Sequence, residues 1–448
     1  MATSFTDRDG AREHIASLGD DFFIVRNPSY VYPEYEVVPL APKAATVPAL
    51  HAVVMDMDGT TTTTEEICLH SLEYMVRCIS GRLTQDDWIG LDQKDDYPHV
   101  IGNSTTRHVE FLLNRYGNWI DPMRFAEAAV RTSAWTLRNS RDDVRMQEVR
   151  GDLANLGIPG LMDSLDDPDD SLVERYAESL IEPLNRFDAR LRLAITIYYQ
   201  RYHYILSLIS AGDETALRRE LPFLDEDTPL ISPMPGIGEF LALARGLLPD
   251  DDEMSAWLID QLRQHPRTTY SQGQEQAYRR NYAFLVDAFR QRPLKIAVVT
   301  SSIRYEAEVV LGEVFRVLRE QAESWPLETE DKDRVLDAFD DWRSFYDTVV
   351  TASDSSEMRL KPHRDLYSLA LHQVGVDPDD FDKVIGFEDS ESGTVAIRAA
   401  GVNLCIAVPF FGTEFHNLEA ACHTIPACLP QAILEHTLFI GNDVAPER

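Results

Sequence analysis

The 448-residue sequence is poor in cysteine and in basic residues. Its five cysteines form no CxxC pair and are too few for a disulfide scaffold of this length. Lys and Arg number 42 against 75 Asp and Glu, which gives a formal net charge of −33. Nucleic acids and anionic membranes are bound by clustered Lys and Arg, so this balance argues against both as partners. A small anionic substrate is still compatible, because it needs only one locally positive pocket.

Long apolar runs are also missing. No stretch approaches the roughly 20 apolar residues that a membrane span requires. The first thirty residues lack the basic start and apolar run of a secretory signal. Hydrophobic residues nevertheless make up 44% of the chain and charged residues 26%, proportions typical of globular proteins. Together with the unpaired cysteines, these features predict a soluble, cytoplasmic protein of two or three domains.

Five short apolar segments are the strongest strand candidates, at 52–55, 296–299, 348–350, 384–387 and 404–408. Runs that are apolar on both faces suit a parallel sheet covered by helices on both sides. Helical patterns separate the later segments, at 305–317, 365–374 and 392–400. This alternation predicts an α/β fold with a Rossmann-like, doubly wound parallel sheet.

Most of the chain is inserted between the first two predicted strands, and this insertion has the pattern of successive helices. Segment 66–79 places apolar residues at the three- and four-residue spacing of one buried stripe, at Ile67, Leu72, Met75, Val76 and Ile79. The same pattern continues at 107–115, 122–137 and 191–209. The sequence therefore predicts an inserted, all-helical domain.

Polar residues stand where the predicted strands end, and ligands of such sheets bind beyond those ends. Asp56 and Asp58 point the same way along an extended chain, and a divalent cation would offset their repulsion. Hydroxyls at a helix start, such as Thr300, suit a phosphate group. Lys361 supplies a cation, and Glu388 and Asp389 supply another acidic strand end.

Taken in order, these segments resemble the four motifs of the haloacid dehalogenase (HAD) superfamily, and specifically its β-phosphoglucomutase-like phosphatases. The matching segments are Asp56-Met57-Asp58-Gly59-Thr60, the strand that ends at Thr300, Lys361-Pro362, and Glu388-Asp389-Ser390 with Gly393. The resemblance covers about 50–80 and 294–409. It implies a HAD-like phosphoric monoester hydrolase with Mg²⁺ as cofactor, acting on a small phosphorylated metabolite through an aspartyl-phosphate intermediate.

The resemblance also implies a role for each motif residue. Asp56 would be the nucleophile, Asp58 the general acid and base, and Lys361 the cation that neutralises the transition state. The implied metal site consists of the Asp56 carboxylate, the Asp58 carbonyl and Asp389, with Glu388 as an additional acidic partner. Phosphate-binding roles fall to main-chain or hydroxyl groups of Gly59, Thr60, Thr300, Ser301 and Ser302.

The domain boundaries follow from the same resemblance. We expect an N-terminal extension at 1–45, an α/β core at 46–61 and 234–448, and a helical cap domain at 62–233. This cap is much longer than is typical of the subfamily. Two further stretches of the core, near 250–292 and 318–345, are extra sequence relative to the family.

The cap departs from the mutases of the subfamily. Thr105 stands where mutases hold an Arg that faces the substrate, although Arg107 or His108 could replace it, and Arg107 is the predicted substrate-binding residue. Cys68 stands near the place of a mutase His, with His70 two residues on. These departures favour hydrolysis. A sugar-phosphate mutase and a non-catalytic protein that binds phosphate or a partner are the alternatives.

Overall fold

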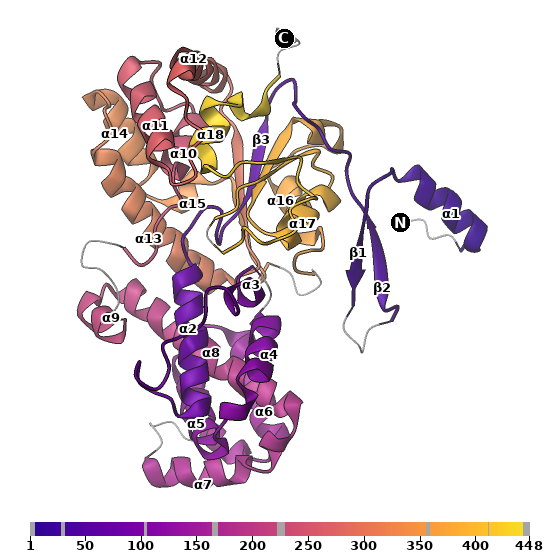
Figure 1. Cartoon of the computed structure of the whole chain (residues 1–448), viewed down its shortest axis with the longest axis vertical. Coiled ribbons are helices and arrows are strands. Elements are labelled where there is room, and N and C mark those ends of the chain that lie inside the picture. The colour runs from indigo at the N-terminus through magenta and orange to yellow at the C-terminus, as the bar shows by residue number, and fades with distance from the viewer. Residues whose placement is uncertain are drawn as a thin grey trace. The chain divides into compact units, whose positions relative to one another are not determined.

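The computed structural model describes residues 5–27, 32–102, 105–163, 169–221, 229–354, 359–410 and 412–441 (Figure 1). Residue contacts divide the chain into two compact units. The first consists of Met1–Thr63, Ile231–Ala307 and Leu311–Arg448, and the second consists of Thr64–Leu230 with Glu308–Val310. Most of the second unit falls within the predicted segment 62–233, and the domain boundaries and the role as a cap stay predictions.

A six-stranded parallel sheet forms the centre of the first unit, with the strand order β5-β4-β3-β6-β7-β8. The strands are β3 (Ala52–Asp56), β4 (Lys295–Val299), β5 (Thr348–Val350), β6 (Val384–Glu388), β7 (Leu404–Ala407) and β8 (His423–Thr424). Each of the five predicted strands agrees with the observed one to within one residue at either end. The sixth, β8, has two residues and was not predicted.

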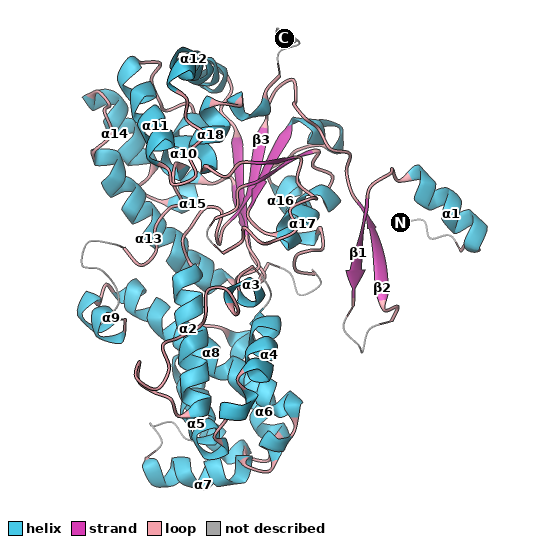
Figure 2. Cartoon of the chain, viewed as in Figure 1, coloured by secondary structure: helices cyan, strands magenta, loops and turns pink. Residues whose placement is uncertain are grey.

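Helices cover both faces of this sheet (Figure 2). On one face, α16 (Asp365–Gln373) and α17 (Glu391–Ala399) pack their apolar residues against β3, β4 and β7 in a single buried cluster. On the other face, Phe240 of α10 (Ile237–Ala244) meets Phe387 of β6 edge to face, with ring centroids 5.4 Å apart. The predicted α/β fold with a doubly wound parallel sheet is therefore confirmed.

Further helices of the first unit are α11 (Asp252–Gln264), α12 (Glu275–Gln291), α13 (Arg304–Glu323, apart from Glu308–Val310), α14 (Thr329–Ala338), α15 (Trp342–Phe345) and α18 (Cys428–Leu434). α10 ends at Ala244, whose carbonyl accepts from the amide of Leu294, just before β4. The helix predicted at 305–317 continues to Glu323.

The N-terminal extension folds as α1 (Arg8–Ser17) followed by an antiparallel hairpin of β1 (Phe22–Arg26) and β2 (Tyr35–Pro39). Phe23 and Val38, opposite each other in the hairpin, pack on Val395 and Ala399 of α17. The buried Arg398 of the same helix donates to the carbonyl of Ala41 and to Asp21. The extension is thus attached to the helical layer beside β6 and β7.

The described residues of the second unit form helices and loops, with no strand among them. These helices include α2 (Glu65–Ser80), α3 (Tyr97–Val100), α4 (Thr105–Arg115), α5 (Pro122–Asn139), α6 (Asp143–Asn155), α7 (Asp170–Leu180), α8 (Phe187–Ala211) and α9 (Glu214–Glu220). The predicted stripe of α2 is fully buried. Beside it, Arg201 of α8 donates to His70 of α2 and pairs with Glu220.

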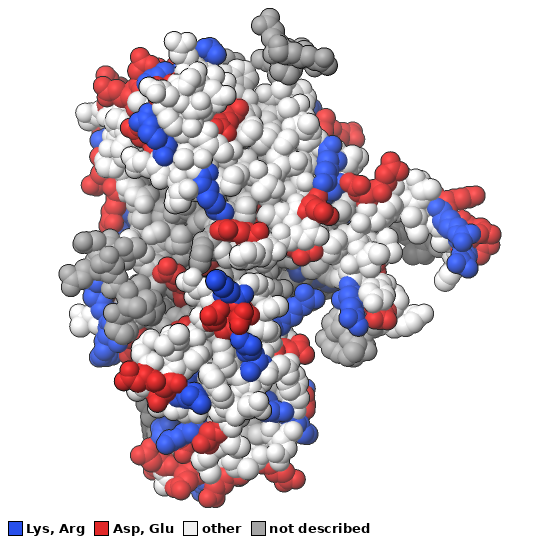
Figure 3. Space-filling model, in the orientation of Figure 1, with Lys and Arg blue, Asp and Glu red and all other residues white. Residues whose placement is uncertain are grey.

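The surface carries charges of both signs. On the face shown in Figure 3, Lys and Arg side chains are scattered among Asp and Glu side chains. None of the helices that the structure describes has the length and apolarity needed to cross a membrane.

Candidate active site

The polar residues predicted to carry chemistry meet at the carboxyl edge of the sheet. Asp56 is the last residue of β3, opposite Val299 of β4, so Thr300 follows beside it. Glu388 ends β6 on the other side of β3. Because β3 lies between β4 and β6, the motif residues that follow these three strands lie next to one another at the carboxyl edge of the sheet.

Lys361 joins two of these strand ends. Its ammonium group donates to the Asp56 carboxylate, to Glu388 Oε1 at 2.7 Å and to the carbonyl of Val299 at 3.3 Å. All three charged side chains are buried. Burial by itself would lower the pKa of Lys361, but the carboxylates of Asp56 and Glu388 raise this pKa above its usual value. Lys361 is therefore a fixed positive charge beside Asp56.

Glu388 is held by more than Lys361. Tyr367 of α16 donates its hydroxyl to Glu388 Oε1 at 2.9 Å, while Ser390 donates its amide and its hydroxyl to Oε2 at 3.2 and 2.9 Å. A Cβ at Gly393, in the first turn of α17, would lie 1.7 Å from Glu388 Oε1. The absence of a side chain at Gly393 thus leaves the space that this carboxylate occupies.

Asp389 and the turn after β3 form the other side of the site. Thr60 donates its hydroxyl to Asp389 Oδ1 at 3.1 Å. Gly59 has a φ of 86°, which favours glycine, and a Cβ there would lie 2.8 Å from Asp389 Oδ2. The turn is braced by Thr61, whose hydroxyl donates to the carbonyl of Asp56 at 2.5 Å.

One carboxylate oxygen each from Asp56, Glu388 and Asp389 lies within 4.8 Å of the other two, the one such group found among the described residues. The ammonium group of Lys361 donates to two of these three carboxylates, those of Asp56 and Glu388. Burial and the neighbouring Glu388 raise the pKa of Asp56 well above its usual value, although Lys361 opposes the shift. A hard divalent cation such as Mg²⁺ fits this all-oxygen, negatively charged donor set.

Asp58 belongs to a separate hydrogen-bonded group. Its Oδ2 accepts from the hydroxyls of Thr300 at 2.9 Å and Ser302 at 3.1 Å, and the Ser302 amide donates to Thr300 Oγ1 at 2.9 Å. Thr300 is fully buried, whereas the side chain of Ser301 is exposed. The hydroxyl-rich segment after β4 therefore fixes the orientation of the Asp58 carboxylate.

The chain leaves and re-enters the first unit next to this site. Thr63 donates its amide to the carbonyl of Ser232 at 2.8 Å, and the Ser232 amide donates to the Thr63 hydroxyl at 2.9 Å. Met234 donates its amide to the carbonyl of Thr61 at 3.0 Å. The residues that flank the inserted unit, Thr63 and Ser232, are thus hydrogen-bonded to each other, and Thr63 lies five residues after Asp58 in the sequence.

The predicted cap residues lie in the second unit. Arg107 is exposed on α4, and its part in substrate binding stays a prediction. His108 is buried on the same helix, and the preceding loop residues 103–104 lie outside the described residues. Cys68 lies 3.3 Å from the Tyr198 hydroxyl, and His70 accepts from Arg201.

Sequence reasoning missed three residues that shape the site: Thr61, Tyr367 and Ser390. Two signals were available in the sequence. Thr61 belongs to a run of five threonines after Gly59, and Ser390 lies within the quoted Glu388-Asp389-Ser390 motif. Tyr367 lies six residues after Lys361, on a helix with ordinary amphipathic spacing, and nothing in that pattern distinguishes it from a core residue.

No family model matches the sequence, and a search of curated proteins gives no significant match. Solved structures similar in fold include CbbY from Rhodobacter sphaeroides in complex with phosphate, at 14% identity and a TM-score of 0.38, covering 84% of this chain and 93% of that one. A putative β-phosphoglucomutase from Thermotoga maritima has 15% identity and a TM-score of 0.31, covering 86% and 97%. A HAD hydrolase from Entamoeba histolytica has 13% identity and a TM-score of 0.35, covering 84% and 93%.

Proposed function

We propose that the protein is a Mg²⁺-dependent HAD-type phosphatase that hydrolyses a small phosphate monoester through an aspartyl-phosphate on Asp56. The main support is the position of Asp56. It lies at a strand end, in contact with the buried ammonium of Lys361 and within a group of three carboxylates. That the ester is small is carried over from the resemblance, in which an inserted helical domain covers the site.

The first step would form the covalent intermediate. A carboxylate oxygen of Asp56 attacks phosphorus, the bond between phosphorus and the ester oxygen breaks, and the alcohol leaves with a proton from Asp58. Lys361 stabilises the negative charge that gathers on the phosphoryl oxygens. Bound Mg²⁺, held by Asp56 and Asp389, would supply Lewis-acid stabilisation of the same charge.

The second step would regenerate the enzyme. Asp58, now ionised, takes a proton from a water molecule, whose oxygen attacks phosphorus as the bond to Asp56 breaks. Inorganic phosphate leaves, and Asp58 holds a proton for the next cycle. The hydrogen bonds from Thr300 and Ser302 to Asp58 Oδ2 support this dual role, because they hold the carboxylate in one orientation.

The proposal is tested by phosphate release from a panel of sugar, nucleotide and aryl phosphates, with Mg²⁺ and with excess EDTA. We expect release from at least one ester with Mg²⁺ and none with EDTA. Asp56→Asn should lower kcat by at least about 10³-fold, because it removes the nucleophile. The exposed Asp333→Asn is the matched control and should behave as the unchanged protein.

The other outcomes separate the alternatives. Full activity of a pure Asp56→Asn preparation would show that Asp56 is not the nucleophile. Interconversion of sugar-phosphate isomers without phosphate release would identify a mutase. Binding of phosphate without release or interconversion would identify a binding protein.

A further inference from the structure

The segment near 250–292, extra sequence relative to the family, forms the helical pair α11 and α12. This pair is fixed to the core at α18. Asn281 of α12 donates to the carbonyl of Leu434 at 2.7 Å, and the Tyr278 hydroxyl lies 3.3 Å from Glu435 Oε1. Tyr278 and Leu434 are buried. Contacts between α12 and the end of α18 therefore hold the helical pair, and with it the turn between the two helices, on the core.

Hydrogen bonds fix the turn that connects α11 to α12. Thr268 donates its hydroxyl to the carbonyl of Leu262 at 2.5 Å, and the Arg267 amide donates to His265 Nδ1 at 3.2 Å. Arg263 stays within the pair, where it bonds to Asp260, Tyr270 and Glu275. The hydrogen bonds of the Thr268 hydroxyl and of the Arg267 amide fix the backbone from which the Arg267 side chain extends, whereas the contacts of Arg263 join α11 to the start of α12.

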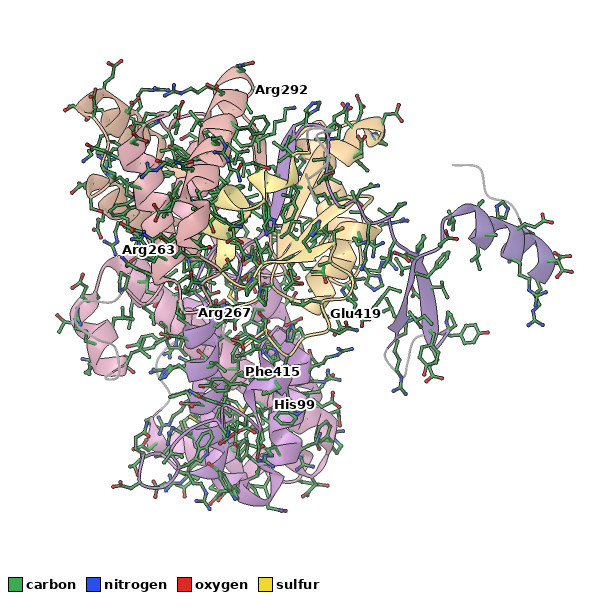
Figure 4. The ribbon with its side chains drawn as sticks, turned by 45° about the horizontal axis from the view of Figure 1, so that its top comes forward. His99, Arg263, Arg267, Arg292, Phe415 and Glu419 are labelled. Carbon is green, nitrogen blue, oxygen red and sulfur yellow. The ribbon has the colours of Figure 1, made fainter. Side chains whose placement is uncertain are left out.

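Arg267 reaches the loop that follows β7. We call the described residues Pro409, Phe410 and Gly412–His416 the post-β7 loop. One guanidinium nitrogen of Arg267 donates to the carbonyl of Pro409 at 2.5 Å, and the other lies 3.4 Å from Glu414 Oε1. Figure 4 labels Arg263 and Arg267 of the segment that contains α11 and α12, and Phe415 of the post-β7 loop. A single side chain thus bonds to both ends of a six-residue span.

The post-β7 loop borders the candidate active site. Just before it, Val408 donates its amide to the carbonyl of Glu388 at 2.8 Å. A Cβ at Gly59 would lie 2.7 Å from Phe410 Cε1 and 2.8 Å from Asp389 Oδ2. The ring of Phe410 and the carboxylate of Asp389 therefore meet at Gly59.

Within the loop, Thr413 is the internal anchor. The Phe410 amide donates to the Thr413 hydroxyl at 3.2 Å, and the His416 amide donates to the Thr413 carbonyl at 3.1 Å. Thr413 is fully buried. The loop is a compact turn whose outer side is held by Arg267.

We propose that Arg267 is a positioning residue that holds the post-β7 loop and thereby keeps the Phe410 ring against Gly59 and Asp389. The effect on catalysis rests on the proposed phosphatase function. A phenyl ring at this corner excludes water beside Asp389, which strengthens the electrostatic interactions of the site. The partly exposed ion pair with Glu414 contributes little energy by itself, so the role of Arg267 is geometric.

Two readouts test this proposal on the full chain. The first is hydrogen–deuterium exchange of the peptide 409–416, which requires no activity. In Arg267→Ala, exchange should be at least about fivefold faster, because the loop opens more often. In the matched control Arg263→Ala, which loses contacts only within the helical pair, exchange of this peptide should be unchanged.

The second readout is kcat/KM for p-nitrophenyl phosphate with Mg²⁺. Arg267→Ala should lower kcat/KM about tenfold, and Arg267→Lys should recover only part of it, because an ammonium cannot hold both partners at once. In a Phe410→Ala background, Arg267→Ala should change kcat/KM less than twofold, since the two residues act through one another. Melting temperatures identify any variant that fails to fold.

The outcomes are distinct. Unchanged exchange in Arg267→Ala overturns the proposal, and so does an equal loss of kcat/KM in both backgrounds. Faster exchange in Arg267→Ala, together with no phosphate release from any ester of the panel by the unchanged protein, supports the tethering of the loop and shows that the proposed function is wrong.

Discussion

Glu388 shows how one residue of the site is positioned by its neighbours. Its two oxygens accept hydrogen bonds from Lys361, Tyr367 and Ser390, all of them buried or nearly so. A carboxylate with this many donors is fixed in place, and it fixes Lys361 in turn. The same ammonium group lies 5.1 Å from the centre of the Tyr367 ring, which adds a cation–π contact. Tyr367 thus supports both members of the ion pair.

This arrangement predicts the effect of Tyr367→Phe. The ring and its cation–π contact stay, but Glu388 loses a buried hydrogen bond. We expect the free energy of unfolding to fall by about 1.5–3 kcal/mol, and kcat to fall severalfold as Lys361 loses its alignment. Urea unfolding and phosphate release measure the two effects.

Tyr346→Phe is the matched control. The Tyr346 hydroxyl is buried and finds no hydrogen-bond partner in the part of the chain that the structure describes. Its removal should leave the free energy of unfolding unchanged or raise it by up to about 1 kcal/mol. Equal losses in both variants would contradict the role given to the Tyr367 hydroxyl.

At this scale the sequence predicts only part of the site. Asp56, Lys361, Glu388 and Asp389 stand in short ordered motifs, and the structure brings them together. The position of Tyr367 depends on where α16 packs, and the position of Arg267 depends on a turn fixed by α18. Such contacts join residues far apart in the chain, and no local pattern contains them.

Among the elements, α17 shows how closely a helix start and a strand end are fitted. Ser390 caps the helix by accepting from the Gly393 amide at 3.1 Å, and it donates to Glu388 at the same time. Gly393 lies in the first turn, directly against the Glu388 carboxylate. The start of α17 and the end of β6 therefore cannot be changed independently.

Gly393→Ala should displace Glu388, because the new methyl group would occupy its place. We expect a loss of about 1–3 kcal/mol in the free energy of unfolding and a large loss of kcat. Gly312→Ala, in the exposed middle of α13 with no heavy atom within 4 Å of the new Cβ, should instead stabilise the protein by about 0.5–1 kcal/mol. Thermal unfolding and phosphate release check both variants, and a Gly393→Ala protein with full activity would contradict this account.

Element prediction succeeded where the apolar pattern alone decides the structure. The five predicted strands are mostly buried, and each consists of a short apolar run. The two-residue β8 is too short to leave a pattern, and it forms because Cys422 and Ile425 donate to the carbonyls of Cys405 and Ala407. For residues 1–45 the sequence predicts only an N-terminal extension and no hairpin of β1 and β2, since the packing partners of this hairpin on α17 lie more than 350 residues away.

The chain divides into two compact units, and a buried histidine gives the second one a pH dependence of its own. In the second unit, His70 is largely buried beside Arg201 and Arg77. Burial first, and these two cations second, lower its pKa from 6.5 to about 3. Below pH 6.5 the unfolded chain binds a proton that the folded chain does not. The stability of this unit should therefore fall as the pH decreases from 6.5 toward 3.

His70→Gln should reduce this pH dependence, because a glutamine can accept the Arg201 hydrogen bond but does not titrate. Between pH 6.5 and 4.5 the unchanged protein should lose about 2 kcal/mol more than the variant. Urea unfolding followed by circular dichroism at several pH values measures the difference, with the exposed His14→Gln as control. Parallel curves for the unchanged protein and His70→Gln would refute the prediction.

The paired crossings at Thr63 and Ser232 have a consequence for how such a chain can change over time. Because the two ends of the helical insertion are hydrogen-bonded to each other, the segment between them behaves as a cassette. A different inserted domain could replace the present one between Thr63 and Ser232 without altering the register of β3 or the turn that carries Asp56 and Asp58. Under the proposed function, reaction chemistry in the sheet and substrate choice in the insertion would then diverge separately.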